Sequence, residues 1–421
     1  MLYLLLGLKE GCVYIKKRNI LVSLDIGTNS IKAAMAEVHG QDVHLLGVSQ
    51  VPSFGLRKGS IIDIESTAKS IDNSLTELER LTGIEVYGAL LGFSGVSISV
   101  VNNHAVVAVA NPTYEITLED KERVLTSARN LALPLDKAII QIIERQYIVD
   151  SYDGVKDPVG MVGSRLEAEV SIVVGAIAAI QNLQRSAQRI NLNVDDLMYN
   201  ALLGAESVLS PAELEMGVTL VDIGGGTTEV TYFEEGSVVQ TSVLPIGGDY
   251  ITKDLAIVLR TSMEEANRVK ERYGVASPDM AKSDLMVNVH NIQGKDGQQV
   301  SQQVIAEIIS ARVIEMTEMI YAELKQFGCL NRMPGGIVLT GGAAELVGLV
   351  DIMEEYTTVP VRLGLPENMK GLPTDFNRPQ NAVVLGGILY SARQGAIKHE
   401  DSQRFMGMID RITYWFKELF R

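Results

Sequence analysis

Short apolar runs alternate along the chain with longer amphipathic segments, a pattern that predicts buried strands and helices in turn. Residues 19–40 begin with an apolar run, turn at Gly27, and continue into a second run in which polar and apolar positions alternate. Residues 217–239 are built in the same way around a turn at Gly225. Each segment therefore predicts a β-hairpin with a buried first strand and a turn that needs glycine.

The rest of each half repeats strand and helix signals. Residues 171–180 and 335–346 predict short buried strands that run into helices. The recurrence of one plan predicts an α/β fold with an internal duplication, in which two similar domains face each other. Residues 86–163 do not fit the duplication and predict a small α+β subdomain inserted in the first half. Residues 258–330 predict a helical insert in the second half.

The composition is that of a globular protein, with 46% hydrophobic and 21% charged residues in a chain of 421. The net charge of −15 argues against a nucleic-acid partner, because neutralising phosphates needs clustered Lys and Arg. Cys12 and Cys329 are far apart and form no motif, so neither a disulfide scaffold nor a zinc site is expected.

The first 18 residues are apolar but do not form a signal peptide, because the basic residues Lys16 to Arg18 follow the apolar run instead of preceding it. The run is also too short to span a bilayer. We expect residues 1–18 to be a poorly ordered extension, produced by an upstream start codon.

The two predicted hairpins have the chemistry of a phosphate site. Glycines at 224–226 let backbone N–H groups point into one hollow, and the Thr227 hydroxyl adds a donor. Asp25 and Asp222 end the preceding strands and suit a hydrated Mg²⁺ that bridges phosphates. Lys32 is placed to reach a phosphate. Two such hairpins facing each other would hold a triphosphate from both sides, although Gly/Asp turns are also typical of ordinary tight hairpins.

A third element fits the same pocket. Gly341 and Gly342 lie between a predicted strand and a helix, where a nucleoside can rest against the backbone; close packing explains such a pair as well. Lys270 and Glu271 are placed to hold ribose or base, and a solvated ion pair explains them equally. The chain contains neither G-x-x-x-x-G-K-[ST] nor G-x-G-x-x-G, so nucleotide binding depends on the paired hairpins.

The last residues predict an amphipathic helix. Bulky apolar residues, including the only Trp of the chain, recur there at steps of three and four: Phe405, Met408, Ile409, Ile412, Trp415, Phe416, Leu419 and Phe420. Residues 404–421 contain four basic and two acidic residues, which suits the plane of an anionic membrane. Docking on the core of the protein is the alternative. One such helix binds reversibly, so stable attachment requires several copies together.

These motifs, in this order, resemble those of the actin-like ATPase superfamily. The likeness rests on LDIGTNSIKAA, VDIGGGTTEV and IVLTGGAAEL and runs from Asn19 to Arg393. The chain is similar in particular to the FtsA family of bacterial cell-division proteins, at residues 148–170, at AEIISARVIEM and in the tail. The resemblance implies a duplicated, ribonuclease H-like fold with an FtsA-type subdomain IC. It assigns 19–85 and 164–215 to subdomain IA, 86–163 to IC, 216–257 and 331–379 to IIA, 258–330 to IIB, 380–394 to a helix returning to IA, 395–402 to a linker, and 403–421 to a membrane-targeting helix.

The resemblance also implies residue roles. It places ATP against Asp25, Gly27, Thr28, Asn29, Lys32, Asp222, Gly224, Gly225, Gly226, Thr227, Lys270, Glu271, Gly341, Gly342 and Ala343, with Mg²⁺ held through water by Asp25 and Asp222. Asp222 is also a catalytic candidate. In related ATPases a Gln or Glu before the second hairpin positions the attacking water, and here Asn200 or Glu206 lies at that place. Asn is not a general base, so slow ATP turnover or a nucleotide that acts as a structural switch is expected.

The function implied is that of an ATP-binding protein that polymerises on the cytoplasmic face of the membrane at the division septum. It would anchor the FtsZ ring to anionic lipid and help to recruit later division proteins. The FtsZ C-terminal peptide would dock in subdomain IIB, with Arg312 as a contact, although a structural core helix explains the same pattern. The alternatives are a pilus-assembly ATPase of the same superfamily, which shares the IC-type insert, and a small-molecule kinase.

Overall fold

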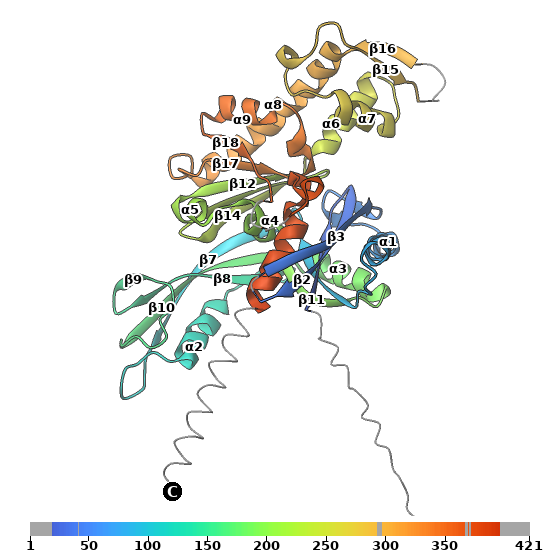
Figure 1. Ribbon diagram of the computed structural model, residues 1–421. Coiled ribbons are helices and arrows are strands. Elements are labelled where there is room, and N and C mark those ends of the chain that lie inside the picture. Colours follow the sequence, from blue (N-terminus) through green and yellow to red (C-terminus); the bar gives the residue numbers. More distant parts are fainter. Residues whose placement is uncertain (1–18, 41, 293–296, 367–368, 370–371, 396–421) are drawn as a thin grey trace, which may run out of the picture.

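Two five-stranded sheets of identical topology form the centre of the molecule (Figure 1). The computed structural model describes residues 19–40, 42–292, 297–366, 369 and 372–395. The first sheet has the order β3-β2-β1-β6-β11, from β1 (Ile20–Ile26), β2 (Ser30–His39), β3 (Asp42–Pro52), β6 (Gly88–Phe93) and β11 (Asn193–Tyr199). The second has the order β14-β13-β12-β17-β18, from β12 (Val218–Ile223), β13 (Thr228–Glu234), β14 (Ser237–Leu244), β17 (Ile337–Thr340) and β18 (Val361–Leu363).

The strand pairing confirms the predicted duplication. In each sheet the first three strands form an antiparallel meander, and β1 or β12 also pairs in parallel with β6 or β17. Both faces of these sheets are buried, as successive residues of β2 show: Ala33 and Met35 lie in one hydrophobic cluster and Ala34 and Ala36 in another. Strands buried on both faces need apolar runs without alternation, which is the pattern of the sequence here.

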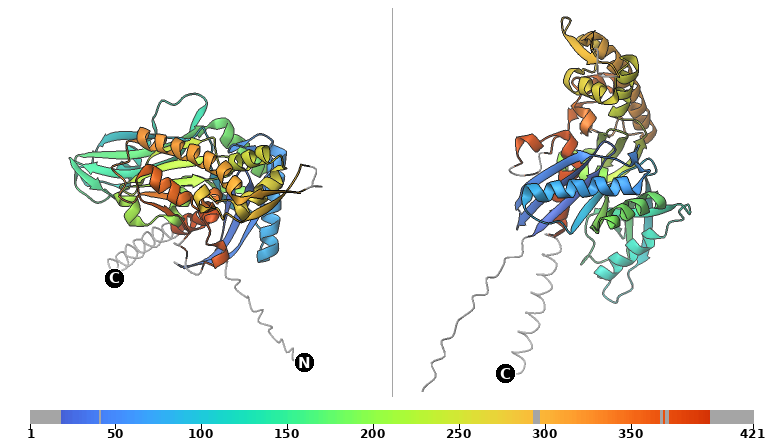
Figure 2. Two further views of the ribbon diagram at one scale, coloured as in Figure 1. Left: turned by 90° about the horizontal axis from the view of Figure 1, so that it is seen from above. Right: turned by 90° about the vertical axis from the view of Figure 1, so that its right-hand side faces the viewer.

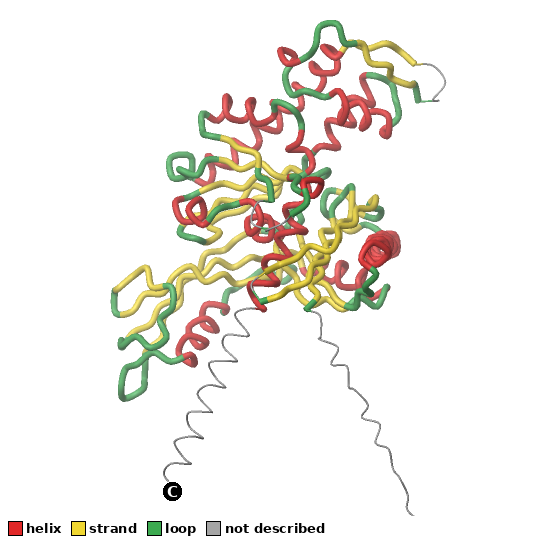
Figure 3. The backbone as a smooth tube through the Cα atoms, viewed as in Figure 1, coloured by secondary structure: helices red, strands yellow, loops and turns green. Residues whose placement is uncertain are grey.

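Helices cover the sheets on both sides (Figure 3). On the first sheet, α1 (Ile64–Thr82) and α3 (Ile177–Arg189) pack on one face, and α4 (Asn200–Val208) and the helical residues 382–395 lie on the other. On the second sheet, α6 (Gly248–Val258), α8 (Gln302–Phe327) and α9 (Leu349–Thr357) share one face. The chain also forms several short elements: β4 (Leu56–Arg57), β5 (Ser60–Ile61), α5 (Pro211–Met216), and 3-10 turns at Pro278–Met280, Gly342–Glu345, Thr374–Phe376 and Pro379–Asn381.

The insert of the first domain is a separate antiparallel sheet with the order β7-β10-β8-β9 and α2 (Leu118–Arg129) on one face. Its strands are β7 (Ser99–Ala108), β8 (Lys137–Val149), β9 (Tyr152–Val155) and β10 (Arg165–Ala176). The predicted insert, 86–163, differs from this sheet at both ends. Residues 88–93 are apolar throughout because β6 is an inner strand of the first sheet. The strand predicted at 171–180 exists, but it is part of β10 and pairs with β7 and β8.

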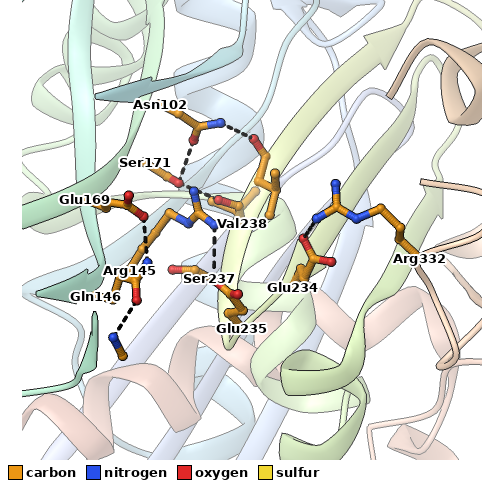
Figure 4. A network of polar contacts seen from close by, with 12 residues as sticks. Asn102, Arg145, Gln146, Glu169, Ser171, Glu234, Glu235, Ser237, Val238 and Arg332 are labelled. Carbon is orange, nitrogen blue, oxygen red and sulfur yellow. Dashed lines mark hydrogen bonds and ion pairs between the residues drawn. The ribbon is translucent and has the colours of Figure 1, made fainter. Parts of the chain in front are cut away.

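The insert also contacts the second domain. The views in Figure 2 show it extending away from the first sheet, and Figure 4 shows its contacts with β14, the edge strand of the second sheet. Asn102 Nδ2 donates to the Val239 carbonyl at 3.1 Å, and Ser171 Oγ donates to the Val238 carbonyl at 2.6 Å. Arg145 pairs with Glu235 at 3.4 Å. The insert therefore covers an edge that would otherwise present unpaired backbone groups.

The insert of the second domain contains the predicted helices, here α7 (Met263–Tyr273) and α8, together with a hairpin that was not predicted. The hairpin consists of β15 (Met286–His290) and β16 (Gly297–Ser301). Val287 and Val289 are buried and alternate with exposed neighbours, which is the period of a half-buried strand.

Three predicted segments lie wholly or largely outside the residues that the structure describes. The N-terminal extension, 1–18, lies outside the described residues, as do the helix 403–421 and all but the first residue of the linker 395–402. Among the described residues, no helix is both long enough and apolar enough to cross a membrane.

Candidate functional site

A cavity of about 490 Å³ lies between the two hairpin turns and is lined by both domains. This volume is within the range of small-molecule sites. Of the residues predicted to bind ATP, the following line it: Asp25, Gly27, Thr28, Asn29, Lys32, Asp222, Gly224, Gly225, Thr227, Lys270, Glu271, Gly341, Gly342 and Ala343. Gly226 is not among the lining residues and lies against the Thr28 side chain. The fold therefore brings together four separate segments of the chain, within 25–32, 222–227, 270–271 and 341–343.

The two hairpin turns have the same geometry. The Gly27 N–H donates to the Ser30 carbonyl at 3.1 Å, and the Gly224 N–H donates to the Thr227 carbonyl at 2.9 Å. The turns approach so closely that a Cβ on Gly225 would lie 2.5 Å from the Asn29 side chain. Glycine is required there by this contact between the domains.

The hairpins place two acids at the bottom of the cleft. Asp25 is buried and pairs with Lys32, whose Nζ lies 3.5 Å from Asp25 Oδ2. Burial, and to a lesser extent the negative charge of Asp25, raise the pKa of Asp222. Two desolvated carboxylates close to each other attract a cation, and Mg²⁺ is suited to such a pair because it keeps most of its water ligands.

A further part of the cavity wall is formed by the turn that follows β17 and by α7. Gly341 has a φ of +86°, and a Cβ there would lie 2.2 Å from Asp222 Oδ1, so the chain passes directly over the second acid. A 3-10 turn follows it where an α-helix was predicted. Lys270 Nζ donates to Thr252 Oγ1 at 2.8 Å, and burial lowers the pKa of Lys270. Glu271 accepts from Asn267 Nδ2 at 2.8 Å. Both residues line the cavity, and each side chain has a hydrogen-bond partner other than the opposite member of the pair.

Of the two residues predicted to position water, only Asn200 reaches the cavity. It is the first residue of α4, directly after β11, and it is buried against the cleft. Glu206 does not line the cavity. It lies more than one helical turn further along α4 and forms an ion pair with Arg393, on the helix 382–395. The structure therefore places Asn200, and not Glu206, at the cavity, and a catalytic role for either residue stays a prediction.

Arg312 also lies outside the cavity lining. Its Nε donates to Asp254 Oδ2 at 2.6 Å, its Nη2 donates to Asp254 Oδ1 at 3.1 Å, and its guanidinium lies over the Tyr250 ring. These contacts join α8 to α6.

One acid of the site was missed. Glu229 on β13 lines the cavity, is 5% exposed, and pairs in register with Asp222 across the second hairpin. Burial and the neighbouring Asp222 raise its pKa. The signal was present in VDIGGGTTEV, where a glutamate lies among the buried residues of a strand. A buried acid in a strand that lines a cleft indicates a functional role.

Two family models match the chain: "Cell division protein FtsA" over residues 219–386 and "SHS2 domain inserted in FTSA" over residues 95–174. The chain is 36% identical to the cell division protein FtsA of Pseudomonas aeruginosa, covering 90% of this chain and 91% of that protein. It is 38% identical to FtsA of Bacillus subtilis, covering 90% and 85%, and 29% identical to FtsA of Escherichia coli K12, covering 96% and 99%.

Solved structures share the fold at low identity. The chain superposes on a structure titled "PilM-PilN type IV pilus biogenesis complex" with a TM-score of 0.62 and 17% identity, covering 88% of this chain and 98% of that one. For MreB5 of Spiroplasma citri bound to AMPPNP the TM-score is 0.54 with 14% identity, covering 91% and 98%. These likenesses confirm the predicted actin-like fold, and the match over residues 95–174 confirms that its insert is of the FtsA type. With these relatives matched over nearly their whole length, the chain belongs to the FtsA family of cell division proteins.

Proposed function

We propose that this protein binds ATP with Mg²⁺ in the cleft, polymerises on the cytoplasmic face of the membrane at the division septum, and anchors the FtsZ ring there while helping to recruit later division proteins. The observation that carries the proposal is the pair of facing hairpins, each with an acid before a glycine turn, in a chain of the FtsA family. The nucleotide would control the closure of the two domains, and the tail would supply the membrane contact.

The residues of the cleft fit ATP and Mg²⁺. The glycine turns leave room for phosphate oxygens beside backbone N–H groups, and Lys32 supplies a positive charge. Asp25 and Asp222 would hold Mg²⁺ through water, which would supply positive charge beside the phosphates. Gly341 to Ala343, Lys270 and Glu271 form the wall on which the nucleoside would rest.

The membrane contact is supported by the sequence pattern of residues 403–421. Apolar side chains on one face and a basic bias on the other suit the interface of an anionic bilayer. Because a single helix of this kind binds reversibly, a filament that presents many copies would bind far more tightly. Polymerisation is therefore part of the proposed anchoring.

The proposed FtsZ contact is tested by replacing Arg312 with alanine. If the FtsZ C-terminal peptide binds the α6–α8 face through this guanidinium, Arg312→Ala weakens peptide binding about tenfold or more, as loss of an interface arginine commonly does. Fluorescence anisotropy of a labelled peptide measures the change.

Asp254→Asn is the matched control, because it weakens the ion pair with Arg312 and leaves the cation in place. We expect this variant to bind the peptide at least as well as the unmodified protein. Equal loss in both variants would mean that the ion pair only positions α8, and unchanged binding in both would place the peptide elsewhere. Either result contradicts a direct contact.

A further inference from the structure

Three side-chain oxygens in the cleft have no hydrogen-bond partner among the described residues. They are Ser94 Oγ, Asn200 Oδ1 and Glu229 Oε2, and all three residues line the cavity. Asn200 is 8% exposed and Glu229 is 5% exposed. Buried polar atoms are nearly always satisfied, so three unsatisfied oxygens in one cavity require an explanation.

The fold brings these oxygens together from both domains. Ser94 directly follows β6 and Asn200 directly follows β11. Because these two strands pair in parallel, both residues lie at the carboxyl ends of the strands of the first sheet. Ligands of α/β proteins bind outside the carboxyl ends of the strands. Glu229 comes from β13 of the second domain, and the Ser94 and Tyr199 hydroxyls lie close enough to its carboxyl to lower its pKa, against the larger effect of burial.

The position of the Asn200 amide is built into the fold. A Cβ on Gly92 would lie 2.4 Å from Asn200 Oδ1, so the amide occupies the space that this glycine leaves open. The amide oxygen is held at the cavity yet bonds to nothing in the described chain. A bound water needs two to four polar partners, and these three oxygens supply that number.

We propose that Ser94, Asn200 and Glu229 hold the water molecule that hydrolyses ATP, and that Glu229 accepts its proton. This inference rests on the proposed binding of ATP. The water oxygen forms a bond to the γ-phosphorus while the bond between that phosphorus and the β,γ-bridging oxygen breaks. One water proton passes to the Glu229 carboxylate and then to solvent, and ADP and inorganic phosphate leave. Asn200 orients the water, since an amide accepts a hydrogen bond but is not a base.

Glu229→Gln in the full chain tests the role. We expect the affinity for mant-ATP with Mg²⁺ to stay within about threefold, because the carboxamide keeps the shape of the side chain. Single-turnover ATP hydrolysis should fall about 100-fold or more, which is the usual contribution of a general base. The melting temperature of the nucleotide-free protein should rise, because folding of the unmodified chain must bury or protonate a carboxyl whose pKa is raised, at a cost in folding free energy that the carboxamide avoids. A residue with only a structural role would not combine higher stability with lost hydrolysis.

Glu234→Gln is the matched control, because Glu234 lies on the same strand, pairs with Arg332 and does not line the cavity. It should hydrolyse ATP at the rate of the unmodified protein. If Glu229→Gln does not fold, Asn200→Ala decides, with an expected loss of hydrolysis of about tenfold at unchanged mant-ATP affinity. Hydrolysis within threefold of the unmodified rate in either folded variant overturns the inference, as does an unmodified protein that binds ATP but never hydrolyses it. A protein that fails to bind mant-ATP at all refutes the proposed function instead.

Discussion

Gly225→Val is expected to lower the affinity for ATP about 100-fold or more, which corresponds to about 2.7 kcal/mol of binding free energy. A Cβ at this position would lie 2.5 Å from the Asn29 side chain, which is held by a hydrogen bond to Asp249. The valine therefore pushes the two turns apart and covers the backbone N–H groups that would meet the phosphates. Titration with mant-ATP in the presence of Mg²⁺ measures the loss.

Gly95→Ala is the control for this substitution. Gly95 lies near the cleft, but a Cβ there meets nothing closer than 3.5 Å, so binding should be unchanged. Combining Gly225→Val with Asp222→Ala should remove measurable binding, because the second change also removes the proposed Mg²⁺ contact. If mant-ATP still binds the double variant, the paired hairpins do not form the nucleotide site.

A chain that ends at Gln394 is expected to lose binding to anionic lipid vesicles entirely. The truncation removes Phe405, Met408, Ile409, Ile412, Trp415, Phe416, Leu419 and Phe420, which form the predicted apolar face. Each large apolar side chain contributes roughly 1.5–3 kcal/mol when fully buried, so these residues would supply most of the binding free energy. Co-sedimentation with phosphatidylglycerol-containing vesicles measures the bound fraction, which should fall to that of a lipid-free control.

Two point variants of the full chain separate the membrane role from a general effect of truncation. Trp415→Glu places a charge on the apolar face and should release the protein from vesicles, whereas Lys417→Gln on the polar face should weaken binding only slightly. Equal vesicle binding by the full and truncated chains, or binding by neither, would show that the tail is not a membrane anchor.

The cleft that we propose to bind nucleotide was largely predictable because its signals are local. An apolar run, an acid and a glycine turn are adjacent in the sequence, and their repetition 197 positions apart, from Asp25 to Asp222, indicated two facing copies. The residues that complete the site depend on three-dimensional contacts. Glu229 becomes part of the cleft through its register with Asp222, and Ser94 through the parallel pairing of β6 with β11. The hairpin register is visible in VDIGGGTTEV, whereas no local pattern specifies the pairing of β6 with β11.

Other differences have similar causes. Asn200 and Glu206 are both polar residues near one helix start, and only the packing of α4 against the helix 382–395 shows that Glu206 faces Arg393. The predicted boundary of the insert differs from the structure because strands β6 and β10 have similar apolar sequences. Only their pairing partners show that β6 belongs to the first sheet and β10 to the sheet of the insert.

A fluorescent fusion of the full chain, imaged in dividing bacterial cells together with labelled FtsZ, tests the central claim most directly. If the protein anchors the FtsZ ring, the fusion forms a ring at midcell that coincides with FtsZ, and a fusion ending at Gln394 fails to hold that ring at the membrane. A full-length fusion that spreads evenly through the cell while FtsZ forms its ring would contradict the claim.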